Sequence, residues 1–368
     1  MHLQPAEDAP GVDAAVRRVI DSGWYVLGPE VEAFERDFAA ACGAGMSVGV
    51  GTGTDAIAII LRALGIGAGD EVITTPLSAA YTALACMMVG ARPVFADLDA
   101  QRLTIDPAAI AAAITPKTAA IMPVHLYGQP ADMPAIMAIA ARHSLAVIED
   151  CCQAHLATCG GQRVGSFGVA AAYSFYPTKN LGALGDGGAI TTSDAQLAAK
   201  MKRVRNGGQT DRYHHGEPGV NSRLDEMQAA ILSARLPWLR GWTEARRARA
   251  AMYRRALGGA LDGALGGVLS GARLTVPPEC DPGHVYHLFP VRSAARDRLQ
   301  AFLREQGIET LIHYPVPMSR QPALRSEQPS PCPVADLVCT EILSLPMYPG
   351  MPETDVHEVA EAVRQFGE

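Results

Sequence analysis

Short apolar runs alternate with alanine-rich helical stretches over residues 47 to 192, and this alternation restricts the possible folds more than any other feature. The predicted strands are EVITT (71–75), PVFAD (93–97), AAIMPV (119–124), LAVIED (145–150), AAYSF (171–175) and AITT (189–192). Strands separated by helical segments form βαβ units, in which a mostly parallel sheet lies between helices. The sequence therefore predicts an α/β fold with its ligand site beyond the strand ends.

The sequence pattern changes after Asn221. Ser222 and Asp225 match a capping box, so a helix is predicted to start at Ser222, and Pro237 is expected to kink or end it. The glycine-rich stretch 258–271 is predicted to be a linker or loop.

A smaller α+β unit is expected to follow this stretch. We predict a large domain over residues 1–240 and a small C-terminal domain over 241–368, with the first 15 or so residues packing against the small domain.

Composition excludes several classes of protein. The formal net charge is −7 and the basic residues form no stripe, which argues against nucleic acid as a partner. The N-terminus does not match a signal peptide, and no run reaches the roughly 18 apolar residues of a membrane span. We therefore expect a cytoplasmic protein with no membrane partner. The eight cysteines include no CxxC pair and are expected to be reduced.

Glycines precede a helix in VGVGTGTDAIAIILRAL, where the helix is predicted to begin near Asp55. Glycine lets the backbone approach a ligand, and a helix start offers unpaired N–H groups to a phosphate. The spacing matches neither GxGxxG nor GxxxxGK. A plain glycine turn before a capped helix explains the pattern equally well.

Two further strand ends carry reactive side chains. LAVIEDCCQAH places Asp150 where it either caps a helix or faces a cationic ligand group. AAAYSFYPTKNLGALGDGGAI places Lys179 five residues after Ser174. A lysine amine becomes nucleophilic when it is partly desolvated, whereas most loop lysines are solvated charges. His125, after another strand, either touches the substrate or is a hydrogen-bonded structural histidine.

Together, a phosphate cradle, a carboxylate and a lysine meet the requirements of pyridoxal 5′-phosphate (PLP). The lysine would hold the cofactor aldehyde as a Schiff base, and the carboxylate would keep the pyridine nitrogen protonated. Metal binding is not expected, because His214 and His215 have no third ligand spaced nearby.

The chain resembles the DegT/StrS-type sugar aminotransferases, which are PLP enzymes of fold type I, the aspartate aminotransferase superfamily. The resemblance rests on blocks in the family's order that span nearly the whole chain: SGWYVLGPEVEAFE, GTGTDA, GDEVITTP, PVFADLD, PVHLYGQPADM, VIEDCCQAH, SFYPTKNLGALGDGGAI, GVNSRLDEMQAAI and IHYPVP. It implies a large domain with a mixed, mostly parallel sheet between helices, and a smaller α+β C-terminal domain.

The resemblance also implies roles for the matched positions. Lys179 would form the Schiff base and shuttle the proton, Asp150 would pair with the pyridine nitrogen, and Gln153 would bond the ring hydroxyl. The phosphate would be bound by Gly53, Thr54, Ser174 and, from the neighbouring subunit, Asn221.

A homodimer with shared active sites is thereby implied. His313 and Tyr314, with the loop RYHHGEPGVNS, would line the sugar side. The chain departs from the family at Ala79, where relatives carry an aromatic residue that stacks on the cofactor; Tyr81 is a candidate substitute.

We therefore expect amino transfer, with glutamate as the donor, to a keto carbon of a nucleotide-linked sugar, and a 3-keto sugar ranks first. Two alternatives remain. The first is dehydration of the sugar, a reaction performed by some relatives that carry histidine in place of the lysine. The second is a PLP-binding regulator without turnover, which Ala79 favours.

Overall fold

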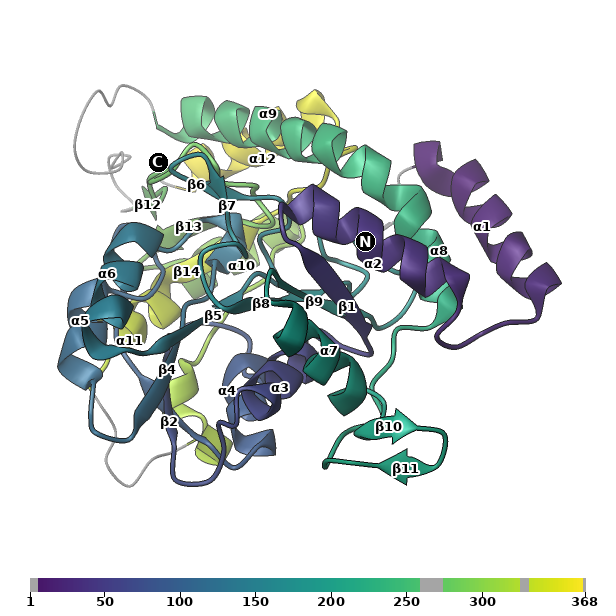
Figure 1. The fold of residues 1–368 in the computed structure, drawn as a ribbon. Coiled ribbons are helices and arrows are strands. Elements are labelled where there is room, and N and C mark those ends of the chain that lie inside the picture. Colours follow the sequence, from purple (N-terminus) through teal and green to yellow (C-terminus); the bar gives the residue numbers. More distant parts are fainter. Residues whose placement is uncertain (1–5, 259–273, 325–330, 367–368) are drawn as a thin grey trace.

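A seven-stranded sheet forms the centre of the molecule, in a computed structural model that describes residues 6–258, 274–324 and 331–366 (Figure 1). The strand order is β1-β9-β8-β5-β4-β2-β3. β9 runs antiparallel to β1 and β8, and the other pairs are parallel. The strands are β1 (Met46–Val50), β2 (Glu71–Thr74), β3 (Arg92–Phe95), β4 (Thr118–Met122), β5 (Ala146–Asp150), β8 (Ala170–Ser174) and β9 (Gly188–Thr192). The predicted α/β class is confirmed, and all six predicted strands are present.

Helices cover both faces of this sheet, because alternate side chains along each strand point to opposite sides. Ala170 and Ala172 of β8 face one apolar cluster, whereas Ala171 and Tyr173 face the other. The first cluster includes α3 (Gly53–Ala63), α4 (Tyr81–Met88) and α7 (Ala195–Val204). The second includes α2 (Pro29–Cys42), α5 (Pro107–Ala113), α6 (Met133–His143) and α8 (Glu226–Arg235).

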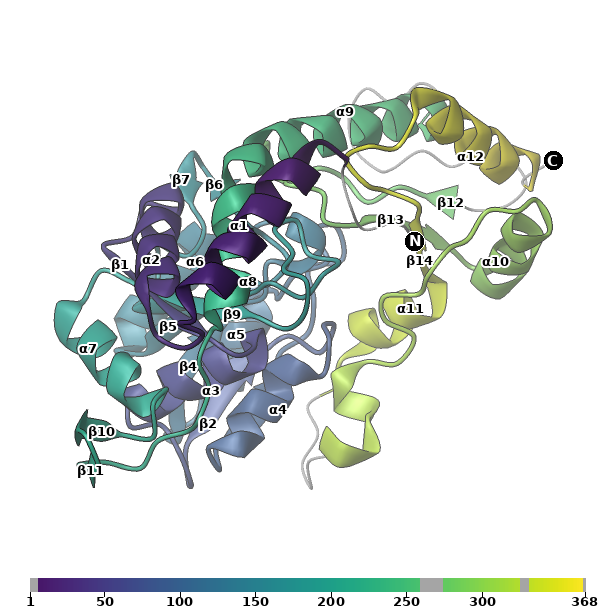
Figure 2. The same ribbon diagram turned by 90° about the vertical axis from the view of Figure 1, so that its right-hand side faces the viewer.

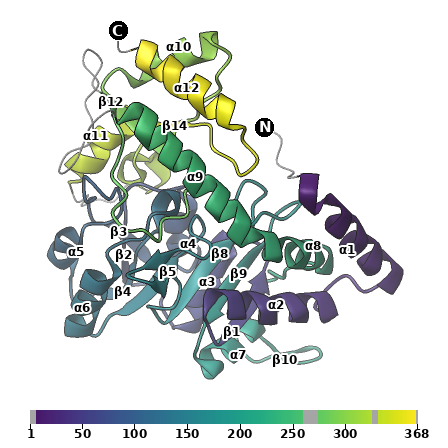
Figure 3. The same ribbon diagram turned by 90° about the horizontal axis from the view of Figure 1, so that it is seen from above.

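The long helix α9 (Leu239–Leu257) extends from the sheet region to a second, separate apolar core (Figures 2 and 3). It follows α8 after a 3₁₀ turn at Leu236–Trp238, so Pro237 interrupts the helix as predicted. The elements of this second region are β12 (Leu274–Thr275), β13 (Phe289–Ser293), β14 (Ile342–Leu345), α10 (Arg296–Glu305), α11 (Pro333–Glu341) and α12 (Glu353–Gln365). The domain boundary near residue 240 stays a prediction, and most of the glycine-rich stretch lies outside the described residues.

The N-terminal helix α1 (Ala9–Ser22) packs on α8 through Ala15 and Val19. Just before it, Asp8 accepts a hydrogen bond of 2.6 Å from Arg235. The remaining elements are β6 (Thr158–Cys159), β7 (Gln162–Arg163), β10 (Gln209–Asp211), β11 (His214–His215) and the 3₁₀ turns Ala6–Asp8, Leu126–Gly128, Met318–Arg320 and Pro322–Leu324. The hairpin β10–β11 projects from the body (Figure 1). Among the described helices, none combines the length and apolar character that a membrane crossing requires.

The predicted capping box at Ser222 is wrong. α8 begins at Glu226, and Asp225 occupies the N-cap position without a side-chain cap bond. The Ser222 hydroxyl has tertiary partners instead, since it accepts from Gly51 N at 2.9 Å and donates to Asp55 Oδ2 at 2.8 Å. It therefore ties the segment before α8 to the glycine loop.

Candidate active site

A cavity of about 610 Å³ lies beyond the carboxyl ends of β2, β4, β5 and β8 and is closed by residues of the C-terminal region. Its volume falls in the range typical of small-molecule sites, and its position is the one that open α/β sheets use. The structure brings eight of the nine predicted site residues to its wall: Gly53, Thr54, Asp150, Gln153, Ser174, Lys179, His313 and Tyr314. Asn221 is exposed and lies outside this cavity, where it pairs with Asn206 in an isolated bridge.

The Lys179 side chain projects into the cavity from the turn after β8. A backbone hydrogen bond of 2.8 Å from Lys179 N to Tyr176 O closes this turn. The amine makes no hydrogen bond or ion pair with any residue the structure describes. Burial lowers the pKa of Lys179, against the opposing effects of Cys152 and Asp150. Both features favour the free, nucleophilic amine.

Asp150, at the end of β5, is 4% exposed, and two donors hold its carboxylate. Thr82 Oγ1 donates to Oδ2 at 2.8 Å, and Cys152 N donates to Oδ1 at 3.1 Å. These bonds fix the carboxylate at the cavity wall. Thr82, at the start of α4, was not recognised from the sequence, since only the fold brings it to Asp150.

Gln153 connects the segment after β4 with the C-terminal segment that contains Tyr314. Its Oε1 accepts from Tyr127 N at 2.7 Å, and its Nε2 donates to the Tyr314 hydroxyl at 3.1 Å. Burial raises the pKa of Tyr314 to about 12, so its hydroxyl stays protonated. The Tyr127 hydroxyl in turn donates to the carbonyl of His313. The C-terminal segment is thus bonded directly to the sheet edge.

The start of α3 forms one end of the cavity. Thr52 caps the helix by accepting from Asp55 N at 3.0 Å, so α3 starts at Gly53 rather than near Asp55. The N–H groups of Gly53 and Thr54 have no partner among the described residues, as expected in a first helical turn. A Cβ on Gly53 would meet Ser174 Cβ at 2.8 Å. Only glycine therefore lets this helix start approach β8 so closely.

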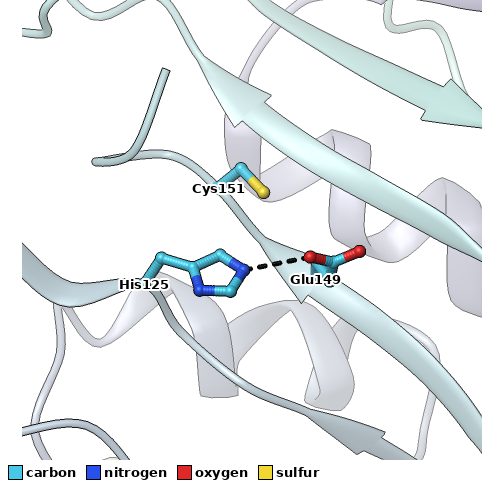
Figure 4. A group of neighbouring side chains, drawn as sticks. All are labelled: His125, Glu149 and Cys151. Atoms are coloured by element: carbon cyan, nitrogen blue, oxygen red, sulfur yellow. Dashed lines mark hydrogen bonds and ion pairs between the residues drawn. The ribbon is translucent and has the colours of Figure 1, made fainter. Parts of the chain in front are cut away.

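A buried network behind the cavity includes His125, Glu149 and Cys151, three potential metal ligands (Figure 4). His125 Nδ1 accepts from Ala131 N at 3.1 Å, so in the neutral ring Nε2 carries the proton and donates to Glu149 at 3.2 Å. The Glu149 carboxylate also accepts from the backbone N–H groups of Gly165, Phe167 and Gly168. His125 is therefore a hydrogen-bonded structural histidine, and its Nε2 has no lone pair to offer a metal.

Comparison with known proteins agrees with this arrangement. Residues 8–364 match the model of the DegT/DnrJ/EryC1/StrS aminotransferase family. The chain belongs to this family. A dTDP-3-amino-3,4,6-trideoxy-alpha-D-glucose transaminase of Streptomyces venezuelae is 46% identical over 97% of this chain and 92% of its own.

A pleiotropic regulatory protein of Geobacillus stearothermophilus is 47% identical, over 97% of this chain and 94% of its own. The crystal structure of S. venezuelae DesV with a ketimine intermediate superimposes with a TM-score of 0.92 at 45% identity and covers 98% of this chain and 95% of that one. The predicted family, the fold-type-I architecture, the aminotransferase class and the PLP cofactor are confirmed.

The cavity fits PLP on its own geometry. The unpaired amides of Gly53 and Thr54, the unpartnered amine of Lys179 and the anchored carboxylate of Asp150 offer an anion cradle, a nucleophile and an anionic partner in one space. His287 also lines this cavity, although no sequence motif predicts a site residue there.

Proposed function

We propose that this aminotransferase moves an amino group from glutamate to the C3 keto carbon of a nucleotide-linked sugar. The observation that carries the proposal is the free amine of Lys179 in the same cavity as Asp150 and the open start of α3. Bound PLP supplies an aldehyde for the amine and a ring that accepts electrons from the substrate carbon. The 3-amino sugar in the name of the S. venezuelae relative supports the choice of C3.

Different cavity residues would hold the cofactor and transfer protons. When PLP is bound, Asp150 would pair with the pyridine nitrogen, Gln153 would bond the ring hydroxyl, and Ser174 with the amides of Gly53 and Thr54 would hold the phosphate. Lys179 Nζ would hold the cofactor aldehyde and would also serve as the base and acid that moves one proton during amino transfer. The lowered pKa of Lys179 supports this role, because a base must be unprotonated to accept a proton.

Ala79 has no ring to stack on the cofactor, and Tyr81 takes over this role. Both line the cavity, and the Tyr81 side chain is 63% exposed, so its ring is free to cover a ligand. His313 and Tyr314 line the sugar side of the same space.

The working form is a cytoplasmic homodimer with shared active sites, in which Asn221 reaches the phosphate of the partner's cofactor. Exposed apolar side chains close to the cavity support a second copy at this face. Tyr176, which lines the cavity, is 52% exposed, and Leu184, in the loop after Lys179, is 45% exposed. The exposure of Asn221 in the single chain agrees with a contact across subunits.

A single-turnover experiment with glutamate tests the proposal. The loaded protein should convert its cofactor from the aldehyde form to the amine form, and a 3-keto nucleotide sugar should then reverse the change and gain an amine. Ala79 and the name of the Geobacillus relative favour a second candidate, a PLP-binding regulator without turnover. An unchanged cofactor spectrum would select this regulator, whereas a product lighter by one water would select a dehydratase.

A further inference from the structure

Asn180 ties the turn that carries Lys179 to the C-terminal region. Its Nδ2 donates to the carbonyl of Val285 at 3.1 Å, and its Oδ1 lies 3.0 Å from His287 Nδ1. The carbonyl can only accept, so the amide nitrogen of Asn180 faces Val285. The remaining amide atom is the oxygen, so His287 Nδ1 carries a proton and donates to it. Asn180 is 5% exposed, and both polar atoms of this buried side chain are therefore bonded to one segment of the chain.

The segment 285–287, to which Asn180 is bonded, is itself tightly held. Val285 N donates to the carbonyl of Gly128, after β4, at 3.0 Å. A Cβ on Gly128 would stand 2.8 Å from a methyl carbon of Val285 and 3.0 Å from His287 N, so the two backbones already touch. Arg246 NH1 also donates to the carbonyl of His287 at 3.2 Å. Since packing this close leaves little room for movement, Asn180 has a rigid support.

Asn180 is also the side-chain anchor that follows Lys179 most closely in the chain. Of residues 177–181, it alone forms a side-chain hydrogen bond with a residue that the structure describes. Beyond it, the next side-chain tie is at Gly182, whose carbonyl accepts from Arg235 NH1 at 2.6 Å. Consecutive Cα atoms are about 3.8 Å apart, so an anchor at residue 180 fixes the point from which the Lys179 side chain starts.

We propose that Asn180 is a positioning residue for Lys179, which holds the lysine turn against segment 285–287 and so keeps the amine inside the cavity. The inference rests on the proposed role of Lys179. Burial lowers the pKa of Lys179, because the cavity wall shields the ammonium form from water. A turn released from segment 285–287 would let water reach the amine and would raise this pKa towards its usual value.

The titratable groups around the amine are all left unaltered when only Asn180 is exchanged. These groups are Asp150, Cys152, His155, Asp186, His287 and His313. Burial lowers the pKa of all three histidines, so they stay neutral near pH 7 and above. Asparagine is neutral as well. A change in the pKa of Lys179 after this exchange therefore reports how well the amine is shielded from water.

Asn180→Ala removes both bonds to segment 285–287. Gln228→Ala is the matched control, because it also exchanges a neutral amide side chain for alanine and also removes a bond to the lysine loop. The Gln228 bond, from Leu184 N to Oε1 at 2.9 Å, is five residues past Lys179. The control therefore loosens the same loop away from the lysine.

The readout is the pH dependence with which full-length, cofactor-free protein captures the aldehyde of PLP, measured by borohydride reduction and peptide mapping at each pH. In Asn180→Ala the midpoint should rise by about one pH unit, which leaves about one tenth of the free amine at pH values below it. Gln228→Ala should leave the midpoint unchanged. An unchanged or lowered midpoint in Asn180→Ala, or an equal rise in both variants, overturns the inference alone.

The absence of a label on Lys179 in the unaltered protein overturns the proposed function as well. A crystal structure of the unaltered protein loaded with PLP provides a check that needs no variant. Both Asn180 bonds should persist in it. A lysine turn separated from segment 285–287 in that structure, in protein that is labelled on Lys179, would refute the positioning role.

Discussion

Substituting Gly53 by alanine should weaken binding of the cofactor phosphate. The new Cβ would stand 2.8 Å from Ser174 Cβ and 2.9 Å from Cys152 Sγ. Carbon atoms in contact need about 3.5 Å or more, so the helix start must retreat by about 0.7 Å. An N–H···O bond of about 2.9 Å would stretch to about 3.6 Å, beyond a true hydrogen bond.

The loss should be about 10- to 100-fold in affinity for PLP. A hydrogen bond to a charged group contributes about 1.5–3 kcal/mol, and each 1.4 kcal/mol is a factor of ten. The assay is titration of cofactor-free Gly53→Ala with PLP and with pyridoxal, which has no phosphate. Only PLP binding should weaken. Gly241→Ala, on α9 with nothing within 4 Å of the new Cβ, is the control. Unchanged PLP affinity, or equal losses for the two ligands, would refute the reasoning.

Two further predictions concern the stability of the cofactor-free protein in urea. Thr82→Val removes the 2.8 Å hydrogen bond to the buried Asp150 carboxylate and should lower the free energy of unfolding by about 1.5–3 kcal/mol. Thr104→Val is the control, because the Thr104 hydroxyl is buried without a partner among the described residues, and it should have little effect. Equal effects of the two substitutions would contradict the role of Thr82. Burial lowers the pKa of folded Lys179 below the value of about 10.4 in an unfolded chain, so the folded state binds fewer protons between these two values and stability rises with pH there. Lys179→Met should therefore be more stable than the unaltered protein at pH 7, with a difference that shrinks towards about pH 10. A difference that is constant with pH would show that the amine is not penalised by burial.

Features encoded by neighbouring residues were predictable from the sequence. The strand that ends in Asp150 and the strand that precedes Lys179 are apolar runs, and the parallel arrangement follows from the helices between them. Because parallel strands end at the same edge, Asp150 and Lys179 could be assigned to one site before the fold was known.

Features that depend on distant partners were not predictable in this way. Ser222 matches a helix cap locally, yet its hydroxyl is bonded to Gly51 and Asp55, which only the fold brings near. Thr82 is bonded to Asp150 and His287 to Asn180, and both partners lie far away in the sequence. The role of Asn221 stays a prediction, because it depends on a second subunit.

The central claim is that one cavity holds PLP through the amine of Lys179, with Asp150 at the ring and the start of α3 at the phosphate. Reduction of the loaded protein with borohydride, followed by peptide mapping, tests it most directly. The cofactor should be recovered on the peptide that contains Lys179 and on no other. A label on another lysine, or none at all, would contradict the claim.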